Sequence, residues 1–283
     1  MKVEPVTTHC GARIEGVDLS GPVGEDLAQM LRRALYRHQV LFLPGQRLDR
    51  AQQKAVTSLF GSLMRLPYVV PTDEDPQVIA VRKSADEVKV GVFGGDWHSD
   101  FSFLAIPPAG SVLSAVTIPP VGGDTLWSNQ VAAFDALDDG MKTLLEDRGV
   151  IHVGAPYGVK HAPPAATRAA VSVKMTRGDP AADEERVHPA VRRHPVSGAQ
   201  ALFLNPIYTT RLEGMSEEDS APVLAGLYRH ATRPEFCCRH RWQPGDLVIW
   251  DNRTTLHYAV NDYDGYDRLL YRTTFTDDLA PSA

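Results

Sequence analysis

The residues with the clearest chemical potential are a histidine and an aspartate two positions apart, within Gly95-Asp96-Trp97-His98-Ser99-Asp100-Phe101-Ser102-Phe103. Alternate residues of a β-strand share a face, so a strand here would project the His98 imidazole and the Asp100 carboxylate together, with Ser99 pointing away. One nitrogen and one oxygen ligand suit a borderline divalent metal such as Fe(II), which needs a third ligand from elsewhere. Two surface or hydrogen-bonded strand residues are the alternative explanation of this spacing.

His257 is the candidate third ligand, because its setting differs from that of the other histidines. It follows an apolar strand expected over 246–250 and the polar turn Asp251-Asn252-Arg253, and it precedes a strand expected over 268–276. The other histidines lie near the N-terminus, at expected helix ends, beside prolines or in an arginine-rich strand. Those positions have simpler explanations than metal binding.

Two arginines, Arg268 and Arg272, lie four positions apart in the last expected strand and would share one of its faces. Burying both without partners would cost several kcal/mol, so outward-facing surface arginines are one interpretation. The other is a clamp for a dianion, since a guanidinium binds carboxylates through a two-pronged hydrogen-bonded fork. 2-Oxoglutarate is such a dianion.

The elements that must position these residues change along the chain. The first sixty residues predict strands over 12–17 and 40–43 and helices over 25–38 and 49–60, the second helix capped by Asp49. From about Pro67 onward, short apolar segments separated by Pro-Pro and Gly-Gly pairs predict a largely β arrangement. The expected strands there are 77–82, 110–116, 124–127, 149–153, 201–204, 235–242, 246–250 and 268–276, with helices over about 129–147 and 216–230. The pattern predicts a mainly β fold with flanking helices, in which 155–200 is a long irregular excursion.

Composition excludes several classes of function. The 283 residues are 43% hydrophobic and 23% charged, values that are ordinary for a globular protein, and the net charge of −6 gives no basic footprint for nucleic acid or a membrane surface. The sequence has no run of 18 apolar residues and no leader pattern at its start. Three cysteines, at positions 10, 237 and 238, suit free thiols in a reducing cytoplasm. We therefore expect a cytoplasmic protein with a small-molecule partner, and self-association into a homo-oligomer stays open.

Taken in chain order, these segments resemble the taurine dioxygenase-like (TauD/TfdA) family of Fe(II)- and 2-oxoglutarate-dependent dioxygenases. The matching segments are Trp97-His98-Ser99-Asp100 with Phe103, Gly122-Gly123-Asp124-Thr125-Leu126-Trp127, Asn205-Pro206-Ile207-Tyr208-Thr209-Thr210-Arg211, Trp242-Gln243-Pro244-Gly245-Asp246, Asp251-Asn252-Arg253, His257-Tyr258-Ala259, Arg268 and Arg272. The resemblance covers nearly the whole chain. It implies a double-stranded β-helix (jelly-roll, cupin-like) core in a single domain, residues 1–283, with lid-like insertions near 84–95 and 155–200.

The resemblance also implies a role for each site residue. His98, Asp100 and His257 would bind Fe(II) and leave positions open for 2-oxoglutarate and O₂, as the facial triad of non-haem iron oxygenases does. Arg268 and the Thr125 hydroxyl would bind the distal carboxylate of 2-oxoglutarate, and Arg272 would lie nearer the metal, beside the C1 carboxylate and the substrate. The reaction would hydroxylate or oxidatively cleave the substrate and release succinate and CO₂. Halogenases of this superfamily have a small residue where Asp100 stands, so a carboxylate there favours oxygenation.

The substrate is the point at which the sequence departs from taurine enzymes. Those enzymes place polar His and Tyr side chains just after a Phe-Gly turn, whereas Phe60-Gly61 here leads to Leu66 and Val69. The glycine-rich segment 91–95 also lacks the family's substrate-contacting Asn. We expect a small organic substrate other than taurine, anionic because Arg272 offers a cation near the iron. The candidate substrate contacts are Leu66, Tyr68, Val69, Phe101, Tyr208 and Arg272.

Two other functions could use the same ligands. A catalytically silent cupin-like protein would keep the fold and the metal and bind a ligand without turnover. A zinc hydrolase could use the same three side chains, but it gives no reason for Thr125, Arg268 and Arg272. Plain core packing is the simpler interpretation of aromatic residues such as Phe101, Phe103 and Trp250.

Overall fold

Four β-sheets form the framework of the computed structural model, which describes residues 1–72, 74–160 and 173–283. The largest sheet has the order β1 (Lys2–Pro5), β2 (Ala12–Glu15), β3 (Val40–Leu43), β14 (Leu247–Asp251), β6 (Gly110–Thr117), β16 (Arg268–Thr276) and β4 (Ser62–Met64), with β5 (Ile79–Lys83) also paired to β16. A second sheet holds β13 (Cys237–His240), β7 (Thr125–Asn129) and β15 (Thr255–Ala259), and a third holds β12 (Thr209–Leu212), β8 (Gly149–His152) and β9 (Arg186–Pro189). The fourth pairs β10 (Val191–Arg193) with β11 (Gln200–Leu202). The fold is therefore mainly β, as predicted.

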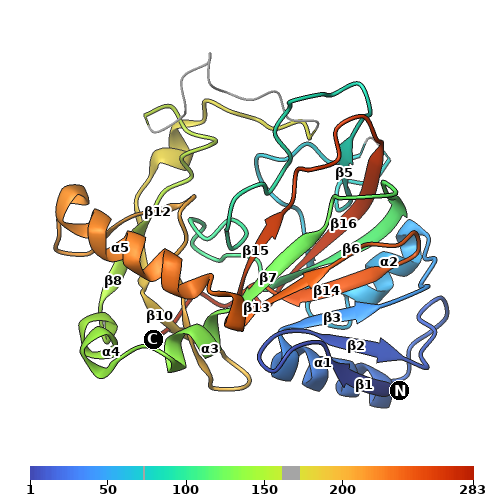
Figure 1. The fold of residues 1–283 in the computed structure, drawn as a ribbon, viewed down its shortest axis with the longest axis horizontal. Coiled ribbons are helices and arrows are strands. Elements are labelled where there is room, and N and C mark those ends of the chain that lie inside the picture. The colour runs from blue at the N-terminus through green and yellow to red at the C-terminus, as the bar shows by residue number, and fades with distance from the viewer. Residues whose placement is uncertain (73, 161–172) are drawn as a thin grey trace.

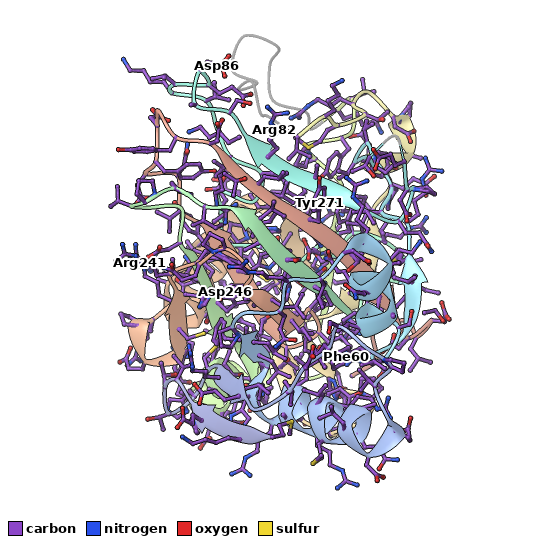
Figure 2. All side chains as sticks on the ribbon, turned by 90° about the vertical axis from the view of Figure 1, so that its right-hand side faces the viewer. Phe60, Arg82, Asp86, Arg241, Asp246 and Tyr271 are labelled. Atoms are coloured by element: carbon purple, nitrogen blue, oxygen red, sulfur yellow. The ribbon has the colours of Figure 1, made fainter. Side chains whose placement is uncertain are left out.

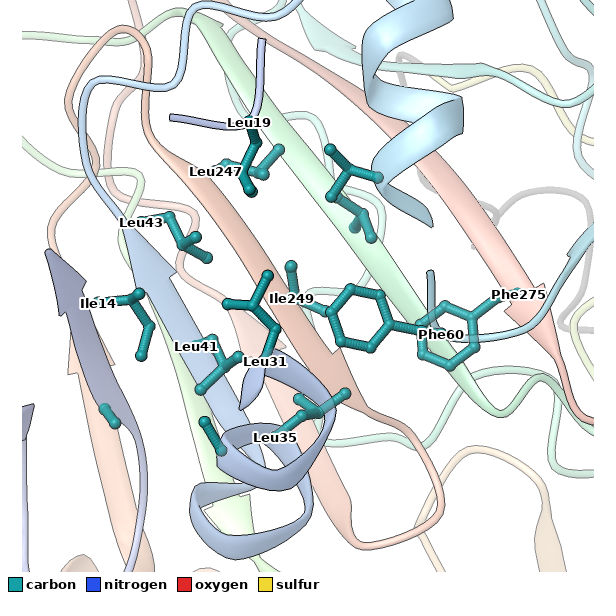
Figure 3. Close-up of a cluster of buried hydrophobic side chains, with 14 of the residues drawn as sticks. Ile14, Leu19, Leu31, Leu35, Leu41, Leu43, Phe60, Leu247, Ile249 and Phe275 are labelled. Carbon is teal, nitrogen blue, oxygen red and sulfur yellow. The ribbon is translucent and has the colours of Figure 1, made fainter. Parts of the chain in front are cut away.

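Two helices cover one face of the large sheet, α1 (Glu25–His38) and α2 (Arg50–Thr57) (Figure 1). Leu31 and Leu35 of α1 pack against Leu247 and Ile249 of β14 in a buried apolar cluster, which Figure 3 shows in close-up. Successive side chains of a strand point to opposite faces of the sheet. Leu247 and Ile249 therefore face the helices, and residues 248 and 250 face the other way.

The opposite face of the large sheet packs against the second sheet. Val248 and Trp250 of β14 meet Trp127 of β7 there in another buried apolar cluster. The last strand alternates in the same way: Tyr271, labelled in Figure 2 near α2, accepts a 3.0 Å hydrogen bond from Arg50 of that helix, whereas Arg272 is buried. The two sheets thus enclose the space into which the buried residues of β16 project.

Three more helices, α3 (Gln130–Asp135), α4 (Asp139–Leu145) and α5 (Glu217–Ala231), pack with the third and fourth sheets. Two of them, α4 and α5, lie on the opposite side of the view from α1 and α2 (Figure 1). Short 3₁₀ turns lie at η2 (Pro180–Asp183) and η3 (Pro234–Phe236). Leu224 and Leu227 of α5 share a buried cluster with Leu202 and Leu212. None of the helices in the described ranges combines the length and apolar character needed to span a lipid bilayer.

Most of the expected elements are confirmed, and the differences have local causes. The helix at 25–38 and the strands at 40–43 and 268–276 have the predicted bounds, and Asp49 caps α2 through a reciprocal pair of bonds with Gln52. The single helix expected over 129–147 is wrong, because the Asp138 side chain accepts from the Met141 N–H and starts a new helix.

The expected irregular excursion at 155–200 is partly wrong. Residues 186–193 form β9 and β10, which pair with β8 and β11, while 161–172 lie outside the described residues. Apolar alternation in these strands is short and interrupted by histidine and arginine, so the sequence pattern does not reveal them. The sequence pattern also does not reveal β1, β4, β12 and β15, because each has only three to five residues and is too short for a clear alternation.

Candidate metal centre and co-substrate cavity

His98 and His257 come together through their own backbones. His257 lies in β15, and the two residues exchange N–H···O bonds of 3.1 and 2.8 Å as an isolated antiparallel bridge. Their rings lie 4.1 Å apart between centroids. The structure thus places side by side two imidazoles that are 159 positions apart in the sequence.

Asp100 completes the constellation, although it does not lie in the regular strand that its spacing predicted. Phe101 has φ of 46°, so the chain turns directly after the aspartate. The carboxylate still faces the imidazoles: Asp100 Oδ1 lies 3.5 Å from His98 Nε2 and 3.6 Å from His257 Nε2. Within the described ranges, these three buried residues are the set of His, Cys, Asp and Glu whose ligand atoms converge within 4.8 Å.

Hydrogen bonds prepare the ligand atoms for a cation. His98 Nδ1 lies 2.7 Å from the Asp96 carbonyl oxygen, which can only accept, so Nδ1 carries the proton and Nε2 presents a lone pair. Burial and the neighbouring His98 hold the pKa of His257 well below its usual value, which favours the neutral form of the His257 ring. Burial alone would raise the pKa of Asp100, but Arg272 and the two imidazoles lower it far below its usual value. Two neutral nitrogens and one carboxylate fit a divalent metal such as Fe(II).

Arg272 lies beside this centre, as predicted, but it has a protein partner. Its Nη2 donates to Asp100 Oδ2 and, at 2.8 Å, to Ser111 Oγ. Asp100 therefore offers Oδ1 to the converging imidazoles while Arg272 holds the other oxygen. The sequence predicted that Arg272 needs an anionic ligand as its partner, and this ion pair with Asp100 removes part of the reason for that prediction.

A cavity between the large sheet and the second sheet connects the triad to the two remaining predicted residues. His98 and His257 line this cavity, and so do Thr125 and Arg268. Its other lining residues include Leu113, Trp127, Trp250 and Arg272. The outward-facing alternative for the arginines is wrong, because Arg268 is 5% and Arg272 2% exposed.

Arg268 is a buried cation without an acidic partner among the described residues. Its guanidinium lies 5.8 Å from the Tyr263 ring centroid and 5.9 Å from that of Trp242, and its Nε atom is buried without a hydrogen-bond acceptor. Burial lowers the pKa of Arg268, and Tyr263 and the charge of Asp124 partly offset that effect. A buried guanidinium in this state is prepared to bind a carboxylate.

Thr125 presents a hydroxyl proton to the same cavity. Its Oγ1 accepts a 3.0 Å hydrogen bond from Trp242 Nε1, a group that can only donate. The Thr125 O–H therefore remains available to a ligand oxygen. An arginine and a hydroxyl donor together fit one carboxylate of a dicarboxylic acid.

The predicted substrate residues gather in one aromatic cluster beside the triad. Leu66, Val69, Phe101 and Tyr208 are buried in it, and Tyr68 packs against it. Tyr68 is the more exposed member and borders a surface groove together with Leu66 and Val69. The structure thus unites these five residues, while Arg272 lies in the adjoining cavity.

Tyr157 belongs to this cluster and was missed by the sequence analysis. Its ring stacks on Phe101 at 5.6 Å and on Tyr68 at 5.0 Å, and its hydroxyl lies 3.4 Å from that of Tyr208. Burial raises the pKa of Tyr157 to about 12, and the charges of Asp100 and Arg272 also act on it. No motif marked this position, because it lies in the excursion at 155–200.

Comparison with protein-family models shows which family the chain belongs to. The model described as "Taurine catabolism dioxygenase TauD, TfdA family" matches residues 2–274. The chain belongs to this family. It is an Fe(II)- and 2-oxoglutarate-dependent dioxygenase that uses O₂ and acts on a small-molecule substrate. The family assignment favours this function over the silent binding protein and the zinc hydrolase.

Two of the similar curated proteins are named for their substrates. An "Alpha-ketoglutarate-dependent sulfate ester dioxygenase" of Pseudomonas putida is 34% identical over 99% of this chain and 90% of its own length. An "Alpha-ketoglutarate-dependent 2,4-dichlorophenoxyacetate dioxygenase" of Cupriavidus pinatubonensis is 32% identical over 97% of both chains.

Solved structures agree with the family. A taurine dioxygenase from Burkholderia xenovorans superimposes with a TM-score of 0.81 at 31% identity, covering 100% of this chain and 92% of its own. A second structure, AAD-2 in complex with Mn(II) and N-oxalylglycine, has a TM-score of 0.79 at 28% identity, with 99% of each chain covered.

Proposed function

We propose that His98, Asp100 and His257 bind the iron, and that Arg268 and Thr125 bind the distal carboxylate of 2-oxoglutarate. One observation carries this proposal: a single cavity is lined by His98 and His257, whose ring nitrogens converge with the Asp100 carboxylate, and also by Arg268, a buried arginine without an ion pair among the described residues. N-oxalylglycine, present in one structural neighbour, shares the oxo-acid group and the second carboxylate of 2-oxoglutarate. When bound, iron and 2-oxoglutarate supply the oxidant that takes a hydrogen atom from a C–H bond, with succinate and CO₂ as co-products.

The protein's own residues would then orient and protect the reaction. Arg272 holds Asp100 Oδ2, which would leave Oδ1 free to bind the metal. In this proposal Arg272 also borders the C1 carboxylate of 2-oxoglutarate. The apolar walls formed by Leu113, Trp127 and Trp250 keep bulk water away from the reacting atoms.

We further infer that the large sheet and the second sheet form a double-stranded β-helix, or jelly roll, within a single domain over 1–283. Support comes from the structural neighbours and from the site's position between the two sheets. The lid-like roles of 84–95 and of the described part of 155–200, the cytoplasmic location and self-association stay predictions. Buried Tyr157 and Val173 tie the second segment to the aromatic cluster, which supports a lid over the substrate side.

For the substrate, we propose a small organic anion with an alkyl or aryl body, other than taurine. Leu66 and Val69 lie buried in the aromatic cluster, where they offer a sulfonate no hydrogen bond. Each unmade hydrogen bond costs about 1–3 kcal/mol, which weakens binding roughly tenfold or more. The names of the two relatives, for a sulfate ester and a phenoxyacetate, describe anions with such bodies.

The Tyr157 and Tyr208 hydroxyls add a polar feature to this largely apolar cluster. Both phenols have a raised pKa and stay protonated, and they form one mutual hydrogen bond. Two O–H groups sharing one bond leave one proton without an acceptor among the described residues. An ester or ether oxygen next to the oxidised carbon would accept it, and sulfate esters and aryloxy acids both have such an oxygen.

Substrate addition to the anaerobic Fe(II)–2-oxoglutarate complex tests the proposal. A medium-chain alkyl sulfate or an aryloxyacetate should perturb the visible charge-transfer band and, with O₂, give stoichiometric succinate. Taurine should do neither at micromolar concentration. Micromolar taurine affinity together with taurine-dependent succinate at enzymatic rates would overturn the substrate assignment.

A further inference from the structure

The side chain of Asn252 holds both backbone groups of Asp100. Its Oδ1 accepts from the Asp100 N–H at 2.8 Å, and its Nδ2 donates to the Asp100 carbonyl oxygen at 3.1 Å. The second Nδ2 proton goes to the carbonyl oxygen of Pro108 at 3.0 Å. Asn252 is 1% exposed, so both donor protons and the acceptor are used inside the protein.

These bonds replace the strand pairing that Asp100 lacks. The backbone of His98 pairs with β15, but the chain leaves that strand-like course and Phe101 adopts φ of 46°, a left-handed conformation unfavourable for a bulky residue. The Asp100 carbonyl belongs to the peptide unit that enters this turn. A bond from Asn252 to that carbonyl therefore fixes the turn as well as the aspartate.

Asn252 is itself held in place. Its carbonyl oxygen accepts from Ser99 Oγ at 2.8 Å, and its N–H donates to the Ala109 carbonyl oxygen. The amide thus forms a rigid link between β14 and the segment that carries Asp100. Ser99, expected to point away from the metal ligands, is one anchor of this link.

We propose that Asn252 is a positioning residue for the metal centre: by fixing the backbone on both sides of Asp100, it directs Oδ1 toward the two imidazoles. This inference rests on the proposed role of Asp100 as an iron ligand. The Asp100 side chain already makes an ion pair with Arg272, so a carboxylate with a mobile backbone would turn toward the guanidinium rather than the metal. Asn252 contacts no ligand atom, and its effect would act through the main chain.

Asn252→Asp is the test variant, because it changes one atom of a nearly isosteric side chain. The new carboxylate can still accept from the Asp100 N–H, but it cannot donate to the carbonyls of Asp100 and Pro108. We expect the Fe(II) dissociation constant, from anaerobic titration with the metal alone, to rise by about tenfold to a hundredfold, as for losses of groups that orient metal ligands. The visible band of the Fe(II)–2-oxoglutarate complex should also shift.

Asn129→Asp is the matched control. Asn129 is also buried, its Oδ1 accepts from two backbone N–H groups, and its Nδ2 donates to the His9 carbonyl and to Gln39 Oε1. The substitution removes the same two donated bonds far from Asp100 along the chain. It should lower the melting temperature by a similar amount and leave the Fe(II) dissociation constant and the band unchanged.

The outcomes separate this inference from the proposed function. Wild-type Fe(II) affinity and band in folded Asn252→Asp would overturn it, as would equal losses of affinity in both variants. A wild-type protein that binds no Fe(II) would instead refute the metal site itself. If Asn252→Asp does not fold, Asn252→Ser, which keeps one hydrogen-bonding group, should show a weaker Fe(II) affinity than the wild type, and wild-type affinity there would reject the proposal.

Discussion

Replacing Arg268 by leucine should separate ligand binding from protein stability. The guanidinium is 5% exposed, has no acidic partner among the described residues, and leaves Nε without an acceptor. Such a cation is unfavourable in the ligand-free protein, since a charge taken out of water without a partner is costly. Arg268→Leu should therefore leave the melting temperature of the ligand-free protein unchanged or raise it.

The same substitution should strongly weaken 2-oxoglutarate binding. Removing one partner of a desolvated charge pair costs about 2–5 kcal/mol. At 1.4 kcal/mol per factor of ten, the dissociation constant should rise by about 30-fold to several thousand-fold. Anaerobic titration of the Fe(II)-loaded protein with 2-oxoglutarate, followed by the visible charge-transfer absorption, measures this change.

Arg253→Leu is the matched control, because Arg253 is equally buried but bonded to Asp251 and Asp277. Removing it leaves the buried Asp251 with His194 as its remaining ionisable partner and takes the ion pair from the half-buried Asp277, which should cost about 3–5 kcal/mol of stability. If Arg268→Leu kept the wild-type affinity for 2-oxoglutarate, or lost as much stability as Arg253→Leu, the assignment of Arg268 as the carboxylate partner would be refuted.

Two further predictions concern a hydrogen bond and a pH dependence. Thr125→Val should weaken 2-oxoglutarate binding by about 1 kcal/mol, roughly fivefold, in the same titration, and an effect larger than that of Arg268→Leu would contradict the geometry. Burial and the nearby His188 lower the pKa of His152 to about 3, and burial lowers that of His188 to about 4. Both titrate near 6.5 when unfolded, so the unfolding free energy should fall by about 1.4 kcal/mol per pH unit for each histidine as the pH drops from 6.5 toward 4. Urea unfolding at pH 7, 6 and 5 checks this, and an unchanged slope in His188→Gln would count against it.

Residue type and even spacing were sufficient to predict the centre of the site. The alternation of β16 placed Arg268 and Arg272 on one face, and the structure confirms both as buried there. The His98–Asp100 spacing identified two residues that do meet, although the turn at Phe101 replaces the expected strand. An even spacing predicts that two side chains point the same way. The observed turn also brings the His98 and Asp100 side chains together, as the expected strand would have done.

Contacts between distant segments could not be predicted in this way. The ion pair of Arg272 with Asp100 depends on the packing of β16 against the loop after residue 98, and no local pattern encodes it. Asn252 looked like part of a polar turn, and its bonds to Asp100 appear only once β14 and that loop are placed together. Tyr157 was missed because its segment has no periodic apolar pattern, so its place in the aromatic cluster follows from tertiary packing alone.

The central claim, that His98, Asp100 and His257 form the iron site, is tested most directly by one anaerobic absorption measurement. Fe(II) and 2-oxoglutarate are added to the wild-type protein and to the single alanine variants at these three positions, each first shown to be folded. The wild type should develop a visible charge-transfer band at one iron per chain, and the three variants should show little or none. Bands of wild-type intensity in all three folded variants would contradict the account.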